Sequence, residues 1–361
     1  MNQINTLIKP THACNMRCKY CFHEKYGYCH EILEMDNLKK YIELLSKRYE
    51  RINLVWHGGE PLMVPLSYYE EIYDFIKKFD NKFIFSLQTN GTLINQEVLN
   101  FFKENDTNIG ISFDGLKNEE TRGKTKIILN NINLMHDNNI YPGAIMVVNQ
   151  NNVNNLIEEY EYFKMLNVGL KINPMFNDGA AKDNNFFNLN PDEYINNFIN
   201  LFKYWMHDKN CNISVSTCEE LVSMVVNNHS GVCTYNSCLG KWLCLDSNGC
   251  LYPCDRLCVE KYNLGSVEKI SNIDDAFKNE KFLKLLIDSY ERRNKCIQNC
   301  EYFENCYGGC NANANLNQDN IACYIQKGIL KELKNYILNQ DNNYYDLNER
   351  YNNILVKTKR K

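Results

Sequence analysis

The stretch THACNMRCKYCFHEK, residues 11–25, decides what the chain can fold around, because it places Cys14, Cys18 and Cys21 within eight residues. Three thiols are one fewer than a closed tetrahedral metal site needs. A Cys-x3-Cys-x2-Cys loop can bind three irons of a [4Fe–4S] cluster and leave the fourth iron open, as catalytic metal sites do. The alternative is a zinc site completed by His12, His23 or Cys29.

Composition narrows the setting of this loop. The chain has 361 residues, 44% of them hydrophobic, which is enough for two domains or for one large domain with an appendage. Forty basic and 44 acidic residues give a net charge of −4, so the charge balance favours neither nucleic acid nor an anionic membrane as a partner. No apolar run approaches the roughly 20 residues of a membrane span, and Met1 leads into polar sequence rather than a signal peptide. We therefore expect a cytoplasmic protein.

Seventeen cysteines are the anomaly of this composition. Disulfide scaffolds are usually secreted chains of under about 80 residues, whereas clustered cysteines in a longer cytosolic chain indicate metal sites. Four cysteines lie in the first 29 residues, none lies between Cys29 and Cys211, and thirteen lie from Cys211 to Cys323. This distribution favours metal binding.

The cysteine-free middle alternates β-rich runs with amphipathic helical stretches. Helices are expected between the runs, one with Asp36 as its N-cap and one with Ser67 and Glu70 as a capping box. The spacing implies parallel strands with crossover helices, in an open doubly wound sheet or in a full or partial β/α barrel. In either fold the loops after the strands converge on one face. The expected strands are TLIKP (6–10), INLVWHG (52–58), KFIFSLQTNG (82–91), NIGISFDG (108–115), YPGAIMVVN (141–149) and VGLKINPMF (168–176).

The cysteine loop, with Tyr20 before its last cysteine, resembles the signature of radical S-adenosylmethionine (SAM) enzymes, as does the turn Gly58-Gly59-Glu60-Pro61. The resemblance covers residues 6 to about 175. It implies an α/β fold, a partial (β/α)6 barrel, in which the open iron of the cluster binds SAM and a 5′-deoxyadenosyl radical removes a hydrogen atom from the substrate. It also implies that backbone of the turn receives the methionyl amino group, and that further cofactor contacts come from Thr89, Asn90, Ser112 and Asp114, for which strand-end caps are the alternative.

The C-terminal cysteines resemble the SPASM domain, a small cysteine-rich domain with two auxiliary [4Fe–4S] clusters, which would bring the total to three. Eight thiolates are the number that two fully ligated clusters require. The resemblance implies one cluster on Cys238, Cys244, Cys254 and Cys310, and a second on Cys296, Cys300, Cys306 and Cys323. Three residues rather than the usual two separate Cys296 from Cys300, and zinc ribbons are the alternative for this region. No role is assigned to Cys29, Cys211, Cys218, Cys233, Cys250 or Cys258, although Cys233 could replace Cys238 as a ligand.

Two residues bear on the reaction. Asp255, directly after Cys254, matches the proposed base of anaerobic sulfatase maturases, which oxidise a cysteine or serine to formylglycine. His57 stands where those enzymes usually carry a glutamine, and WHGGEP is frequent in maturases of ribosomally made peptides. We therefore favour a peptide maturase that works by hydrogen-atom abstraction, with a sulfatase maturase as the alternative. A non-catalytic iron–sulfur or zinc interaction protein is the alternative from another class.

The expected organisation follows from these motifs. Residues 1–180 would form the barrel, 181–232 a helical linker, 233–325 the SPASM domain and 326–361 a C-terminal helix and tail. The stretch NPMFNDGAAKD, residues 173–183, would border the substrate channel. The expected partners are a peptide or protein substrate and an external one-electron reductant such as flavodoxin or ferredoxin.

Overall fold

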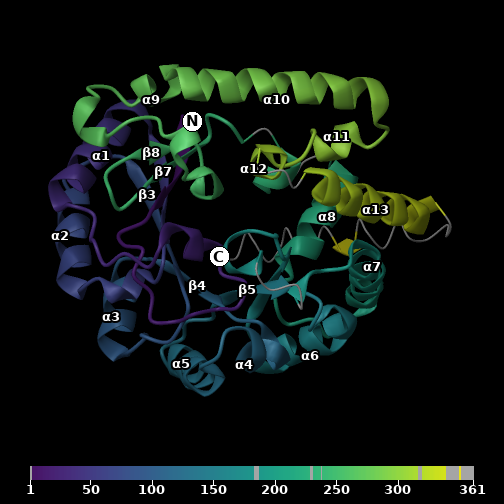
Figure 1. The fold of residues 1–361 in the computed structure, drawn as a ribbon. Coiled ribbons are helices and arrows are strands. Elements are labelled where there is room, and N and C mark those ends of the chain that lie inside the picture. The colour runs from purple at the N-terminus through teal and green to yellow at the C-terminus, as the bar shows by residue number, and fades with distance from the viewer. Residues whose placement is uncertain are drawn as a thin grey trace. The chain divides into compact units, whose positions relative to one another are not determined.

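The structure is a computed structural model that describes residues 2–182, 187–227, 231–236, 238–315, 319–338 and 349–350. The chain divides into two compact units (Figure 1). Unit 1 contains residues 1–112, 122–142 and 238–290, and unit 2 contains residues 113–121, 143–237 and 291–361. The predicted domain boundaries stay predictions, and Asp183 and the tail from residue 351 lie outside the described residues.

Unit 1 is built on six strands in the order β4-β3-β2-β1-β7-β8. All neighbouring strands are parallel except β7 and β8, which are antiparallel. Ile8 pairs with Trp56, and Trp56 pairs with Leu87. The carboxyl ends of β1 and β2 therefore lie side by side, next to the last residues of β3. The strands are β1 (Gln3–Ile8), β2 (Arg51–Trp56), β3 (Lys82–Thr89), β4 (Asn108–Ser112), β7 (Trp242–Leu245) and β8 (Leu251–Tyr252).

Helices follow these strands, and α1, α2 and α3 succeed one another along the outer side of the strands in Figure 1. Alternate residues of β1 and β2 are buried, and the indole N–H of Trp56 donates to the hydroxyl of Tyr73 on α2 at 3.1 Å. The helices of unit 1 are α1 (Met35–Arg48), α2 (Leu66–Ile76), α3 (Gln96–Glu104), α5 (Thr125–Asp137) and α9 (Asp274–Lys278), and α10 (Glu280–Asn299) continues from it into unit 2. Its short 3-10 helices are η1 (Phe22–Tyr26), η2 (Pro61–Met63), η8 (Asp255–Leu257), η9 (Glu260–Tyr262) and η10 (Val267–Lys269).

Unit 2 contains the parallel strands β5 (Gly143–Val148) and β6 (Gly169–Pro174). Two of its long helices, α7 and α13, are in contact: the ring of Tyr336 on α13 packs edge-on against the ring of Phe202 on α7. The helices are α4 (Asn118–Thr121), α6 (Leu156–Leu166), α7 (Pro191–His207), α8 (Ser216–Asn227), α11 (Phe303–Cys306), α12 (Asn311–Asn315) and α13 (Asp319–Leu338). The 3-10 helices are η3 (Gly115–Lys117), η4 (Val153–Asn155), η5 (Gly179–Ala181) and η7 (Cys233–Tyr235).

The prediction of parallel strands with intervening helices is confirmed, since each of the six expected runs overlaps a strand, although β1 begins at Gln3, three residues before the expected run. Two predicted helix starts are wrong. Helix α1 begins at Met35, so Asp36 lies in its first turn, where its charge still favours the helix dipole. Helix α2 begins at Leu66 directly after Pro65, so Ser67 is already inside the helix and makes no capping box with Glu70. None of the helices in the described residues has the length and apolarity that a membrane span needs.

Candidate functional site

The three cysteines of the opening stretch lie in one loop after β1. The backbone N–H of Cys21 donates to the carbonyl of Cys18 at 3.1 Å, and the N–H of Met16 donates to Sγ of Cys14 at 3.4 Å. Burial, with smaller contributions from the nearby thiols of Cys18 and Cys14, raises the pKa of the Cys21 thiol to about 11. Neighbouring thiols that burial keeps protonated become strong ligands once a cation replaces their protons. This donor set fits an iron–sulfur cluster.

The Gly58–Pro61 turn rests directly on the backbone that precedes this loop. Gly59 N–H donates to the carbonyl of Thr11 at 3.1 Å, and Glu60 N–H donates to the carbonyl of Ala13 at 2.8 Å. A Cβ on Gly59 would lie 2.3 Å from the Ala13 carbonyl oxygen, so only glycine permits this approach. The turn is therefore packed directly against the backbone that leads into the cysteine loop, as expected of a turn that lies beside the predicted cluster.

Glu60 is the hub of a buried network at the ends of β2 and β3. Its carboxylate accepts from Thr89 Oγ1 at 2.7 Å, from Asn90 N–H at 2.7 Å and from Leu62 N–H at 3.0 Å. Burial raises the pKa of Glu60, although these donors oppose the shift. The Glu60 side chain thus fixes the turn. The side-chain amide of Asn90 donates to Asn15 Oδ1 at 2.8 Å and extends the network to the cysteine loop.

Three other residues predicted to bind the cofactor lie as follows. Tyr20 is buried, and its hydroxyl accepts from Arg122 at 2.9 Å. Ser112 Oγ accepts from Gln88 at 3.0 Å. Asp114 belongs to unit 2, where its carboxylate accepts from Thr121 Oγ1 at 2.7 Å and from Val147 N–H at 3.0 Å. The contacts of Asp114 match the alternative of a strand-end cap, and the cofactor roles of all three stay predictions.

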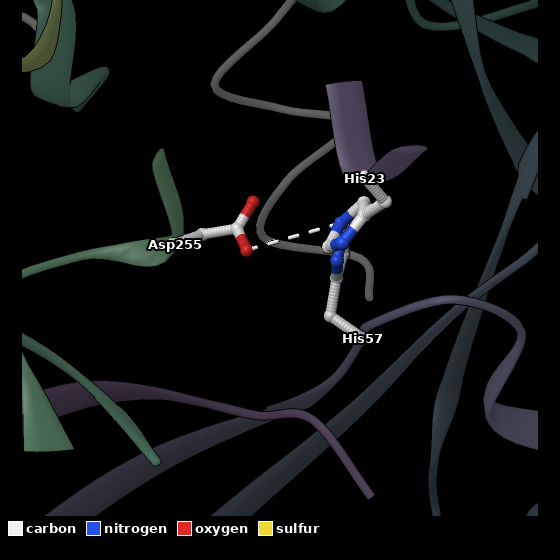
Figure 2. A group of neighbouring side chains, drawn as sticks. All are labelled: His23, His57 and Asp255. Atoms are coloured by element: carbon white, nitrogen blue, oxygen red, sulfur yellow. Dashed lines mark ion pairs between the residues drawn. The ribbon is translucent and has the colours of Figure 1, made fainter. Parts of the chain in front are cut away.

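Asp255 and His57, the two predicted catalytic residues, lie together in unit 1 with His23 (Figure 2). The three side chains offer atoms that all lie within 4.8 Å of one another. Asp255 Oδ1 lies 3.9 Å from His23 Nε2, and the imidazoles of His23 and His57 have centroids 5.4 Å apart. His23 comes from η1, directly after the cysteine loop, and His57 follows β2. Strand ends far apart in sequence thus meet beside the predicted cluster.

The electrostatics of this group are set by Lys9, whose Nζ lies 2.8 Å from Asp255 Oδ1. Burial by itself would raise the pKa of Asp255, but the Lys9 ammonium, followed by His57 and His23, holds it far below its usual value. Burial lowers the pKa of both His57 and His23. At neutral pH the site therefore contains an ionised carboxylate, a buried ammonium and two neutral imidazoles.

Sequence reasoning missed Lys9, and it also missed the contact between His12 Nε2 and Asp246 Oδ1 at 2.7 Å. Lys9 directly follows the last residue of β1, as His57 follows β2. A charged residue directly after an apolar strand was the available signal, because that position faces the converging loops. His23 entered only as a possible zinc ligand.

Three of the thiols predicted for the first auxiliary cluster, those of Cys238, Cys244 and Cys254, lie in unit 1, and Cys310 lies in unit 2. Cys244 is fully buried on β7. Its Sγ lies 3.5 Å from that of Cys258, which had no predicted role.

The cysteines predicted for the second auxiliary cluster all belong to unit 2. Cys300 N–H donates to the carbonyl of Cys296 at 2.9 Å, so the two thiols lie one helical turn apart on one face. The spacing of three residues between Cys296 and Cys300 is therefore compatible with both thiolates binding the same cluster. Burial raises the pKa of Cys306 to about 11, with further contributions from the thiols of Cys323, Cys300 and Cys296. The thiols of Cys323, Cys300 and Cys296 are thus close enough to Cys306 to act on its charge.

Comparison with known proteins agrees with this geometry. Residues 8–163 match the family model described as the radical SAM superfamily. The chain contains a radical SAM domain. This domain uses SAM and a [4Fe–4S] cluster, and the chain is an oxidoreductase-type enzyme, so the prediction of a non-catalytic interaction protein is set aside.

The similarity extends beyond the radical SAM domain. A cysteine-type anaerobic sulfatase-maturating enzyme of Clostridium novyi is 29% identical, covering 92% of this chain and 96% of that protein. A serine-type enzyme of Bacteroides thetaiotaomicron is 25% identical, covering 85% and 82%. The solved structure "Native anSMEcpe with bound AdoMet and Cp18Cys peptide" superposes with a TM-score of 0.83 at 25% identity, covering 98% of this chain and 99% of that one. The predicted α/β radical SAM fold, followed by a cysteine-rich C-terminal region, is confirmed.

Proposed function

We propose that this enzyme oxidises a side chain of a peptide or protein substrate by hydrogen-atom abstraction. The observation that carries the proposal is the position of Asp255, an ionised carboxylate beside His57 and directly after the predicted cluster ligand Cys254. Oxidation of an alcohol or thiol requires loss of a hydrogen atom, a proton and an electron. When bound, SAM and the clusters would supply hydrogen-atom abstraction and an electron acceptor.

The chain's own residues have distinct tasks in this proposal. Cys14, Cys18 and Cys21 hold the cluster, and the Gly58–Pro61 turn holds the methionyl group of SAM. Asp255 accepts the proton of the substrate hydroxyl or thiol, since it is already in the ionised state that a general base requires. Its ion pair with Lys9 keeps the carboxylate ionised and holds it in place.

Two products are compatible with this chemistry. Similarity along nearly the whole chain to cysteine-type and serine-type sulfatase maturases supports formylglycine. A second candidate, a crosslink or another modification of a ribosomally made peptide, is favoured by His57, because an imidazole replaces the amide of those maturases at a position that faces substrate. The predicted auxiliary clusters and an external reductant serve either product.

Mass spectrometry separates these candidates. The reconstituted, reduced enzyme is incubated anaerobically with SAM and with Cys-x-Pro-x-Arg or Ser-x-Pro-x-Arg peptides. Formylglycine from serine appears as the loss of two hydrogens. Formylglycine from cysteine appears as the loss of two hydrogens together with replacement of sulfur by oxygen, because water hydrolyses the thioaldehyde and hydrogen sulfide leaves. Formation of 5′-deoxyadenosine without change in either peptide would exclude the sulfatase-type product. Absence of SAM cleavage altogether would contradict the proposed function.

A further inference from the structure

Lys9 is an unusual residue for its position, because its side chain is fully buried. It follows the last residue of β1, and its backbone N–H donates to the carbonyl of Leu245 at 2.9 Å, which ties it to β7. Burial of an ammonium is unfavourable unless the charge is paired and hydrogen-bonded. A lysine in this place therefore needs a partner that offsets the free-energy cost of removing its ammonium from water.

That partner is Asp255, which Lys9 holds at two points. The ammonium lies 2.8 Å from Asp255 Oδ1 and donates to the Asp255 backbone carbonyl at 3.4 Å. The ring of Tyr26 packs 4.6 Å from the ammonium, and the Tyr26 hydroxyl donates to the same carbonyl at 3.5 Å. Both the side chain and the main chain of Asp255 are thus fixed from β1 and from η1.

The same contacts argue against a divalent cation at this place. His23, His57 and Asp255 form a group that could ligate one, and His23 has both ring nitrogens buried without a hydrogen-bond partner. The Asp255 charge, however, is already neutralised by Lys9 at hydrogen-bonding distance. An added dication would be repelled by that ammonium at close range. The cation that pairs with the Asp255 carboxylate is therefore the Lys9 ammonium.

We propose that Lys9 is a positioning residue, which fixes the Asp255 carboxylate beside His57 and so keeps it aligned with the substrate. The test by product formation depends on the proposed function, whereas the test by melting temperature does not. Misplacement of a reacting group by about 1 Å can lower a rate about a hundredfold. Loss of Lys9 should therefore lower product formation by about that factor while SAM is still cleaved, so that more 5′-deoxyadenosine forms per product.

A double-mutant cycle tests the pairing directly. Lys9→Met and Asp255→Asn each leave one buried charge unpaired, so each should lower the melting temperature of the reconstituted enzyme, and the double variant should recover most of the loss. Additive losses in the double variant would overturn the proposal. Lys9→Arg keeps the charge and should retain more product per SAM cleaved than Lys9→Met. If Lys9→Arg and Lys9→Met formed equally little product per SAM cleaved, the proposal would be contradicted.

The matched control is Lys164→Met in unit 2, where Lys164 Nζ lies 2.6 Å from Asp208 Oδ2 in another largely buried pair. It should lower the melting temperature without changing the ratio of product to 5′-deoxyadenosine. An equal change of the ratio in Lys164→Met would show that Lys9 acts on general stability rather than through Asp255. If no peptide is modified by the wild type, the proposed function fails, while the melting-temperature cycle still decides the pairing.

Discussion

At the residue scale, the proposed reaction would depend on one carboxylate and on the charges around it. Asp255 lies close to His23 and His57 (Figure 2). The Lys9 ammonium, 2.8 Å from Asp255 Oδ1, holds the pKa of that carboxyl far below its usual value. The motifs could be predicted from sequence because each cysteine and glycine is required by its own chemistry. Lys9 was missed because no motif contains it. Its position directly after an apolar strand was the available signal, but a sequence does not reveal that a lysine is fully buried.

Replacement of Asp255 by asparagine removes the proton acceptor while keeping the shape of the side chain. We expect Asp255→Asn to abolish peptide oxidation, with a loss of at least about a hundredfold, and to leave formation of 5′-deoxyadenosine intact. Chromatography of 5′-deoxyadenosine and mass spectrometry of the peptide from the same reaction measure both. Product formation equal to the wild type would rule out Asp255 as the base.

At the element scale, the turn after β2 fits against the backbone before the cysteine loop without room for a methyl group. Gly59→Ala should therefore destabilise the protein by about 2 kcal/mol, since overpacking a close contact forces backbone to shift. Denaturant unfolding measures this change. Gly143→Ala is the matched control, because nothing lies within 4 Å of the Cβ it would add, and we expect a change within about 0.5 kcal/mol. Equal effects of the two substitutions would contradict this view of the turn.

Helix α6 supplies a second test at this scale. Glu159 is buried, accepts from Leu116 N–H at 2.8 Å, and has a pKa that burial raises to about 7. A carboxyl whose pKa is higher folded than unfolded favours the folded state when protonated. Stability should therefore fall as the pH rises from about 4.3 through the folded pKa. Glu159→Gln should flatten this fall in thermal unfolding, whereas Glu158→Gln on the exposed face should not. Parallel profiles for Glu159→Gln and the wild type would contradict the shift.

The strands and helix ends differ in how well sequence predicts them. All six expected runs overlap strands, because a buried parallel strand requires a continuous apolar or β-branched run. The short strands β7 and β8 were missed, since they lie inside the cysteine-rich region, where the spacing of thiols hides the hydrophobic pattern. The start of α2 was misplaced because the helix begins at Leu66, directly after Pro65. Ser67 therefore lies inside the helix rather than at its N-cap.

At the scale of the whole molecule, the chain combines a radical SAM domain with a cysteine-rich C-terminal region. The ligand sets of the auxiliary clusters are predictions from the resemblance to the SPASM domain. Three cubane clusters would contain about 12 irons per chain. Conversion of Cys300 and Cys306 to alanine should remove about four of them, whereas Cys211→Ala should remove none. Iron analysis and Mössbauer spectra measure the content. An unchanged iron content in the double variant would exclude the second ligand set.

The central claim is that this enzyme removes a hydrogen atom from a peptide side chain. The most direct measurement uses a Cys-x-Pro-x-Arg peptide deuterated at the cysteine Cβ, incubated with the reduced enzyme and SAM. We expect deuterium in the 5′-deoxyadenosine of the wild type and none in a variant that lacks Cys14, Cys18 and Cys21. Modified peptide accompanied by 5′-deoxyadenosine without deuterium would contradict the claim.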